Sequence, residues 1–160
     1  MSKIIEKVKT VIQKNGFQAI IITNNEDEVL ISADGQNCGS QFTTHFVGKD
    51  ASGNNDAALL AQTKFPIKVP LNKREKMISF FNHLNCHQLH GWLALDTYDG
   101  TIVCRAGAHS ISDDSINDAI IDPFLFYCMN KLDELHPHIT DLIYTEKSVD
   151  DILIEMGLNK

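Results

Sequence analysis

The fold class of this chain is decided by a stretch near its middle, which reads Trp92-Leu93-Ala94-Leu95, then Asp96-Thr97-Tyr98-Asp99-Gly100, and then Thr101-Ile102-Val103-Cys104. Two apolar runs typical of strands stand on either side of an Asp-Gly pair, and such a pair favours a tight turn between antiparallel strands. The stretch therefore predicts a β-hairpin over residues 91–106 that turns between Asp96 and Gly100.

Helices are predicted on both sides of this hairpin. Before it, apolar residues follow helical spacing at Leu71, Met77, Ile78, Phe81 and Leu84. After it, a third helix should begin at Ser112 or Asp113 and carry an apolar residue at every fourth position: Ile116, Ile120, Phe124, Cys128 and Leu132. Pro123 predicts a kink or a break with Asp122 as a new cap, and the helix should end before Pro137. A short last helix is expected over residues 148–156.

The first part of the chain predicts one more helix and three strands. Apolar residues share one helical face at Ile4, Ile5, Val8, Val11 and Ile12. Ser2 can cap this helix, and Asn15-Gly16 can end it with a left-handed residue. Strands are expected over residues 17–23, 29–31 and 41–47, with a turn over 24–27. Residues 57–64 suit a helix by composition and a strand by position, so both readings stay open.

These elements predict a single α+β domain over residues 1–160, in which helices pack on an antiparallel sheet. The expected order is α-β-β-β-α-β-β-α, with an extended piece at residues 67–69 between Pro66 and Pro70. A polar, glycine-containing stretch over residues 34–56 is predicted to be loop-like outside the strand at 41–47. A chain of 160 residues is long enough to bury a substantial core as one domain.

Charge and composition exclude several classes of partner. The net charge is −7, from 14 basic and 21 acidic residues, and no basic stripe is present, so binding to nucleic acid or to an anionic membrane is not expected. The longest apolar run is too short to span a bilayer, and charged residues interrupt the N-terminus, so we expect no signal peptide and a cytoplasmic location. Four widely spaced cysteines, Cys38, Cys86, Cys104 and Cys128, are then expected to be thiols.

The sharpest chemical feature is a group of possible metal ligands at His83, Cys86, His87 and His90. On a continuous helix these residues would share one face, and histidine and cysteine are the preferred zinc ligands. Asn85 and Gly91 indicate instead that the helix ends near Asn85, which would separate the four side chains. We therefore expect no cofactor and no stoichiometric zinc, and a metal site remains the second reading.

The other polar residues have structural explanations. The acidic pairs Asp113-Asp114 and Asp150-Asp151 stand where helices are expected to begin, and negative charge is favourable there. Arg105 lies on a hairpin strand, where Asp96 or Glu75 would be a natural partner for its charge. The signatures of phosphate-binding loops, dinucleotide-binding folds, serine hydrolases and zinc peptidases are missing from the sequence.

Several ordered segments resemble one family. They are Phe80-Phe81-Asn82-His83-Leu84-Asn85, Gly91-Trp92-Leu93-Ala94-Leu95-Asp96, Asp99-Gly100-Thr101-Ile102-Val103-Cys104-Arg105, and the ending from His136 through Tyr144 to Ile152. Over roughly residues 65–155 this set is similar to the YbjN-type family, although Ala94 stands where that family often has an acidic residue. The resemblance implies the fold of type III secretion chaperones, no known catalytic residues, and a binding or regulatory role.

The sequence thus predicts a non-enzymatic protein-binding module, chaperone-like or regulatory, that forms a homodimer. The alternative is a metal- or small-ligand-binding sensor that uses the histidine and cysteine group. The residues expected to contact a partner are Trp92, Ile121, Leu125 and Phe126. Ile121 and Leu125 form a second apolar stripe on the third helix, and a helix in a two-layer domain needs only one stripe for its own core. A partner subunit, a client peptide or the C-terminal helix are the alternatives for what covers that stripe.

Overall fold

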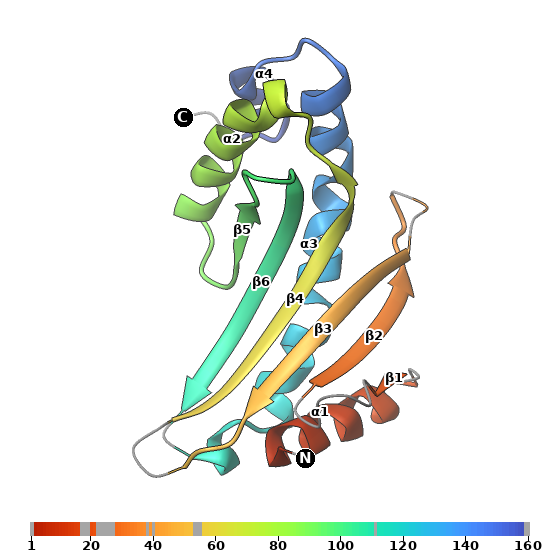
Figure 1. The fold of residues 1–160 in the computed structure, drawn as a ribbon, viewed down its shortest axis with the longest axis vertical. Coiled ribbons are helices and arrows are strands. Elements are labelled where there is room, and N and C mark those ends of the chain that lie inside the picture. Colours follow the sequence, from red (N-terminus) through yellow and green to blue (C-terminus); the bar gives the residue numbers. More distant parts are fainter. Residues whose placement is uncertain are drawn as a thin grey trace.

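The computed structural model describes residues 2–16, 20–21, 28–37, 39, 41–52, 56–110 and 112–158. The helices are α1 (Lys3–Lys14), α2 (Arg74–Cys86), α3 (Asp118–Tyr144) and α4 (Val149–Glu155). The strands are β1 (Ile20–Ile21), β2 (Glu28–Asp34), β3 (Gln41–Lys49), β4 (Ala57–Lys68), β5 (Trp92–Leu95) and β6 (Thr101–Ser110). Two short 3₁₀ turns, Leu71–Lys73 and Asp113–Ser115, precede α2 and α3. Figure 1 shows this arrangement.

The strands form one antiparallel sheet in the order β1-β2-β3-β4-β6-β5. The predicted hairpin is confirmed, because Trp92 pairs with Arg105 and Leu95 with Ile102. Its turn is closed by the Asp96 N–H, which donates to the Thr101 carbonyl at 2.8 Å, and by the Gly100 N–H, which donates to the Asp96 carbonyl at 2.8 Å. The α+β class and the antiparallel sheet are therefore as predicted.

The ambiguous segment at residues 57–64 is a strand, and it continues to Lys68 as β4. β4 lies between β3 and β6 and is bonded to both, so pairing on two sides outweighs the helical preference of its alanines and leucines. Its pairing with β6 shifts register between Lys64 and Lys68, and Pro66 stands in this irregular stretch, where proline is tolerated. The expected order is thus corrected: four strands precede α2, and α4 follows α3.

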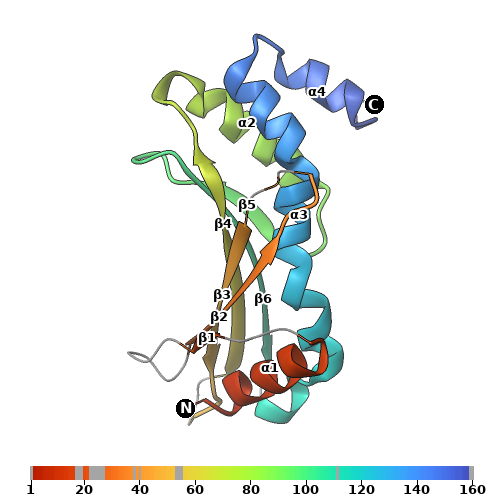
Figure 2. The same ribbon diagram turned by 90° about the vertical axis from the view of Figure 1, so that its right-hand side faces the viewer.

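The helices cover one face of the sheet. Figure 2 views the sheet nearly edge-on, with α3 along one face, α1 at one end, and α2 with α4 at the other. Alternate strand residues such as Phe42, Phe46 and Leu59 point into this layer and are buried there. They pack with the apolar residues of the helices into one core. None of the helices formed by the described residues is both long and apolar enough to cross a membrane.

α1 forms as predicted. The Ser2 hydroxyl accepts from the N–H of Ile4 at its start, and Gly16 follows its end with φ at +78°. The expected strand over residues 17–23 is described only at Ile20–Ile21, and the expected turn over 24–27 lies outside the described residues. α4 is confirmed, and Ser148 and Asp151 form a reciprocal capping box at its start.

α3 differs from the prediction at both prolines. The helix is continuous through Pro123 and Pro137, and its cap is Asn117 rather than Ser112, Asp113 or Asp122. Pro137 has no N–H for the carbonyl of Asp133, four residues earlier. The side-chain amide of Asn37 donates to that carbonyl instead, at 3.3 Å. A loop from the sheet thus replaces the bond that the proline removes, so the helix does not end there.

Candidate functional site

No described helix covers the face of the sheet opposite α3 (Figure 2). Pairing registers place Leu30, His45, Gln62, Arg105 and Trp92 in one row across five strands of this outer face. Further apolar side chains on the same face are Val47, Leu60 and Val103. We call this surface the outer face. It combines apolar residues with a few charged ones.

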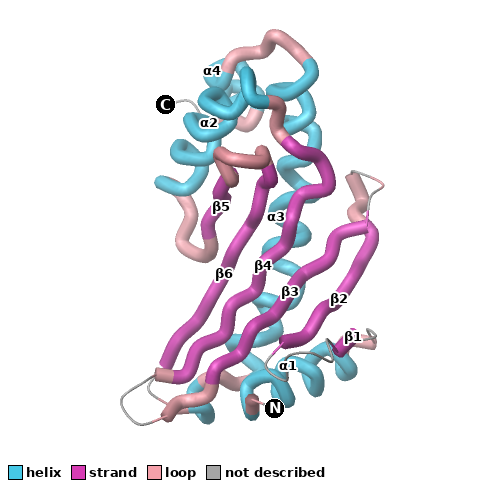
Figure 3. Tube along the Cα trace, in the orientation of Figure 1, coloured by secondary structure: helices cyan, strands magenta, loops and turns pink. Residues whose placement is uncertain are grey.

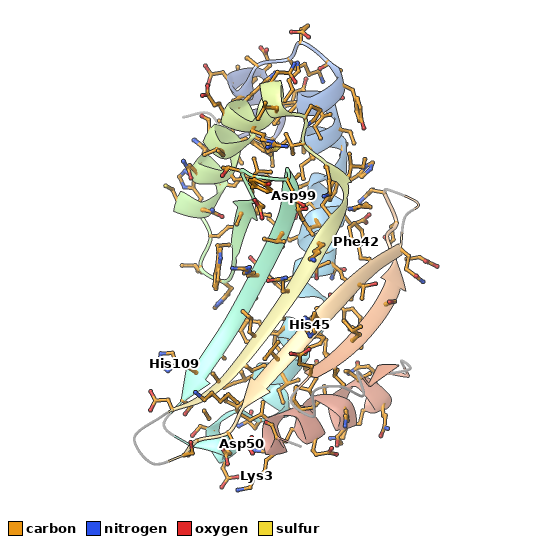
Figure 4. The ribbon with its side chains drawn as sticks, viewed as in Figure 1. Lys3, Phe42, His45, Asp50, Asp99 and His109 are labelled. Atoms are coloured by element: carbon orange, nitrogen blue, oxygen red, sulfur yellow. The ribbon has the colours of Figure 1, made fainter. Side chains whose placement is uncertain are left out.

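The charges on the outer face are held by neighbours on adjacent strands. The Arg105 side chain donates through Nε to Oε1 of Gln62 at 2.6 Å. This corrects the expectation of an Asp96 or Glu75 partner, because a neutral amide on the neighbouring strand is closer. His45 contacts the Glu28 carboxylate at 2.8 Å, and Figure 4 shows His45 in the middle of the sheet. Among the described residues, no carboxylate forms an ion pair with Arg105. The positive charge of Arg105 on the outer face is therefore not neutralised in this way.

The four predicted partner-contacting residues fall into two groups. Trp92 is 43% exposed on β5, and Phe126 is half-buried on α3 beside Asp133 and Phe42, in a cavity of about 430 Å³. Ile121 and Leu125 are 0% exposed. α3 packs on α1 as well as on β3, β4 and β6, so the second apolar stripe is used by the chain's own core. Ile121 and Leu125 are therefore core residues and do not lie on a surface that a partner could contact.

The structure brings together only part of the predicted metal-ligand group. α2 ends at Cys86, as the sequence indicated to within one residue. The His83 and His87 rings lie 5.1 Å apart, and Nε2 of His83 is buried without a hydrogen-bond partner. Cys86 is exposed, and among the described residues no three histidine, cysteine or acidic side chains gather closely enough to hold a metal ion.

A groove that the sequence analysis did not identify lies between the end of β6 and the start of α3. Its volume is about 380 Å³, and it is lined by His90, Ala108, Ala119, Ile120, Pro123, Phe124 and Tyr127. Helical spacing assigned Ile120 and Phe124 to the core with Cys128. Spacing alone cannot show that these two lie at the border of that face and remain only partly buried.

Tyr127 fixes one wall of this groove. Its hydroxyl donates to Oε1 of Gln88 at 3.0 Å and to the carbonyl of His90. Burial and the nearby Cys104 and Cys128 thiols raise the pKa of Tyr127 to about 12, so the hydroxyl stays a donor at neutral pH. The connection from α2 to β5 is thereby held against α3.

Asp50 and Asp99 each stabilise a local part of the fold through hydrogen bonds. Partial burial would raise the pKa of Asp50, but hydrogen bonds from Ser2 and from the N–H groups of Lys3 and Ile4 outweigh it and hold that pKa below its usual value. Asp50 therefore supports the start of α1 (Figure 4). Asp99, labelled at the hairpin turn, contacts Lys68 and Thr101, which lower its pKa.

The contacts of two further acidic residues, Asp133 and Asp113, were not expected from the sequence. The carboxylate of Asp133 accepts from the N–H groups of Gln36 and Asn37 at 2.9 and 3.0 Å, a contact that no local pattern predicts. Asp113 does not cap α3, because its carboxylate accepts from the N–H of Ala51 at 2.6 Å. These carboxylates join segments that are distant in sequence.

No protein-family model matches this chain, and a search of curated proteins finds no match. The resemblance to the YbjN-type family therefore stays a prediction from the residues quoted for it.

Proposed function

We propose that the chain is a non-enzymatic protein-binding module, chaperone-like or regulatory, and that it binds its partner through the outer face. The observation that carries this proposal is the single helical layer, which leaves the apolar residues of the other face uncovered (Figure 2). A sheet in a two-layer domain can expose one face only if that face is polar or is covered by something else. Leu30, Val47 and Leu60 in neighbouring strands favour the second case.

Two observations support a binding role over catalysis. The acidic clusters cap helices, close turns and join segments, so their positions are explained without a reaction. The order of elements is only partly the expected one, since four strands instead of three precede α2 and α4 follows α3. That order supports a binding role only by analogy of fold.

We also propose that the protein forms a homodimer through apolar surface. Each chain carries a net charge of −7, which opposes self-association, so added salt should strengthen the dimer slightly. Trp92, at the edge of the outer face, is the most exposed large aromatic residue on the sheet and a suitable anchor for an interface.

The outer face is tested by Leu60→Glu. This change places a charge among the apolar residues of β3 and β4 without entering the core, because Leu60 is only half-buried. We expect the dimer to dissociate to chains of 17.9 kDa in light scattering. We also expect proteins captured from the native host to be lost from the variant in pull-downs analysed by mass spectrometry.

Leu71→Glu is the matched control, since Leu71 is 77% exposed on the turn before α2 and should tolerate the change. If Leu60→Glu keeps both the dimer and the captured proteins, the outer face is not the binding surface. If the wild-type chain is monomeric at high micromolar concentration, the homodimer proposal is wrong.

A metal- or ligand-binding sensor remains the second candidate, and the contact between His83 and His87 is the observation in its favour. Structural zinc sites use four protein ligands, and here only two candidates meet. We therefore expect elemental analysis of the purified protein to find far less than one zinc per chain. About one zinc per chain, lost on His83→Ala combined with His87→Ala, would contradict this and favour the sensor.

A further inference from the structure

Beyond Arg105, β6 has no paired strand among the described residues on its β5 side, although Gly91 still lies beside Ala106. β5 pairs only with residues 102–105 of β6, whereas β4 pairs with β6 as far as Ser110. Figure 3 shows β6 continuing well past the end of β5, and in Figure 4 His109 lies at this free end. We call residues 106–110 of β6 the open edge.

The hydrogen-bonding groups of the open edge follow from the pairing of β5. The side chain of Asn85 bonds both the N–H and the carbonyl of Leu93, so Leu93 faces away from β6. In an antiparallel ladder the residues alternate, so Arg105 faces β5, and Gly107 and His109 face the open edge. Among the described residues, no hydrogen bond reaches the N–H or carbonyl of either residue on that side.

The two halves of this sheet edge differ in whether a side chain bonds their outward backbone groups. Asn85 covers the outward N–H and carbonyl of Leu93 in β5, which is one way proteins protect an edge strand from pairing with other chains. No described side chain covers the outward backbone groups of Gly107 and His109 in this way, and the helix-facing side chains Ala106 and Ala108 are small. Two donors and two acceptors thus lie in line with β5, where a further strand would continue the ladder.

The groove lies beside this edge, on the helix side of the sheet. Ala108 from β6 and Ile120, Phe124 and Tyr127 from α3 all line it. A strand residue opposite Ala108 would point its side chain toward α3, because directly paired residues share a face. The volume of about 380 Å³ admits one large apolar side chain.

We propose that the open edge binds an extended segment of a partner protein as an added antiparallel strand, which places one large apolar side chain in the groove opposite Ala108. The occupant is a segment of another protein rather than a second copy. Two copies paired through this edge would each offer only Ala106, Ala108 and Ser110 on the helix side, and these cannot fill the groove. The inference rests on the proposed protein-binding function but uses a different surface from the outer face.

The experiment uses a library of random twelve-residue peptides displayed on phage and selected on the immobilised full chain. We expect the enriched peptides to share one large apolar residue between residues with strand propensity. The affinity of one synthetic, fluorescently labelled peptide from this set is then measured by anisotropy. Enrichment of no common pattern overturns the proposal.

Two variants at one position separate the backbone contact from the side chain. His109→Pro removes an N–H that faces the open edge and leaves the bonds to β4 in place. We expect it to weaken peptide binding roughly tenfold or more, whereas His109→Ala, which keeps that N–H, should change affinity less than about threefold. Phe124→Ala should also weaken binding. Circular dichroism is used to check that each variant is folded. Equal affinity of His109→Pro and wild type overturns the proposal.

N-methylation of the peptide tests the strand register. In an antiparallel pair, the residue opposite Ala108 points its N–H away from β6, and its two neighbours point theirs toward Gly107 and His109. Methylating either neighbour should abolish binding, and methylating the apolar residue itself should not. The opposite pattern, or no pattern, overturns the added strand.

Different experimental outcomes would overturn the proposed function and this inference. If Leu60→Glu loses the captured host proteins while His109→Pro keeps both those proteins and the selected peptide, the module binds proteins without the open edge. A dimer that His109→Pro dissociates and that the peptide does not displace would assign the edge to a second copy and overturn the inference.

Discussion

Leu125→Glu is expected to destabilise the folded protein strongly rather than to dissociate an assembly. Leu125 is 0% exposed where α3 packs in the core, so the carboxylate would be buried without a partner and the packing of the leucine would be lost. The combined cost is about 4–5 kcal/mol or more, against a total stability of about 5–15 kcal/mol for a domain of this kind. Urea unfolding followed by circular dichroism measures it.

Leu89→Glu is the matched control for this prediction. Leu89 is 94% exposed in the connection between α2 and β5, so the same chemical change should alter the free energy of unfolding by less than about 0.5 kcal/mol. A folded Leu125→Glu variant with wild-type stability and a smaller particle size would restore α3 as a partner-binding surface.

Gly100→Ala is expected to destabilise the hairpin strongly. Gly100 has φ at +80°, and a Cβ there would lie 2.3 Å from the carbonyl oxygen of Val69. The backbone cannot easily withdraw, because the N–H of Val69 donates to the carbonyl of Gly100 at 2.8 Å. Strain and displacement together should cost about 3 kcal/mol in the free energy of unfolding.

Gly16→Ala separates the conformational part of this cost from the steric part. Gly16 has nearly the same φ, +78°, and a Cβ there meets nothing within 4 Å. Only the left-handed conformation is then penalised, by about 1 kcal/mol. Equal losses of stability for the two variants in urea unfolding would show that the close approach to Val69 does not constrain the turn.

The sequence pattern correctly predicted those features that depend on residues close together in the chain. The Asp99-Gly100 turn, the Ser2 cap and the ends of α2 and α4 follow from residues within a few positions of each other, and the structure places them as predicted. The strand identity of β4 does not follow in this way. It depends on β3 and β6, which are brought beside it only by the complete fold.

The environments of the site residues were mispredicted for the same reason, since they depend on the complete fold. The apolar spacing of α3 detected the buried side chains correctly but could not say which element covers them, so Ile121 and Leu125 were assigned to a partner. The partner of Arg105 was missed because the register that brings Gln62 opposite it is a property of the whole sheet. The open edge has no signature in sequence, since it arises from the difference in length between β5 and β6.

The bond from Asn37 to the carbonyl of Asp133 has a consequence for how the molecule assembles. Pro137 interrupts the internal bonding of α3, and the replacement donor, Asn37, lies 96 positions before Asp133 in the chain. An isolated α3 would fray at Pro137, so its last two turns gain full support only after the loop between β2 and β3 has docked. Contacts so far apart in sequence form late, because a long loop must close first. We therefore expect the C-terminal turns of α3 to be completed only after the sheet has formed.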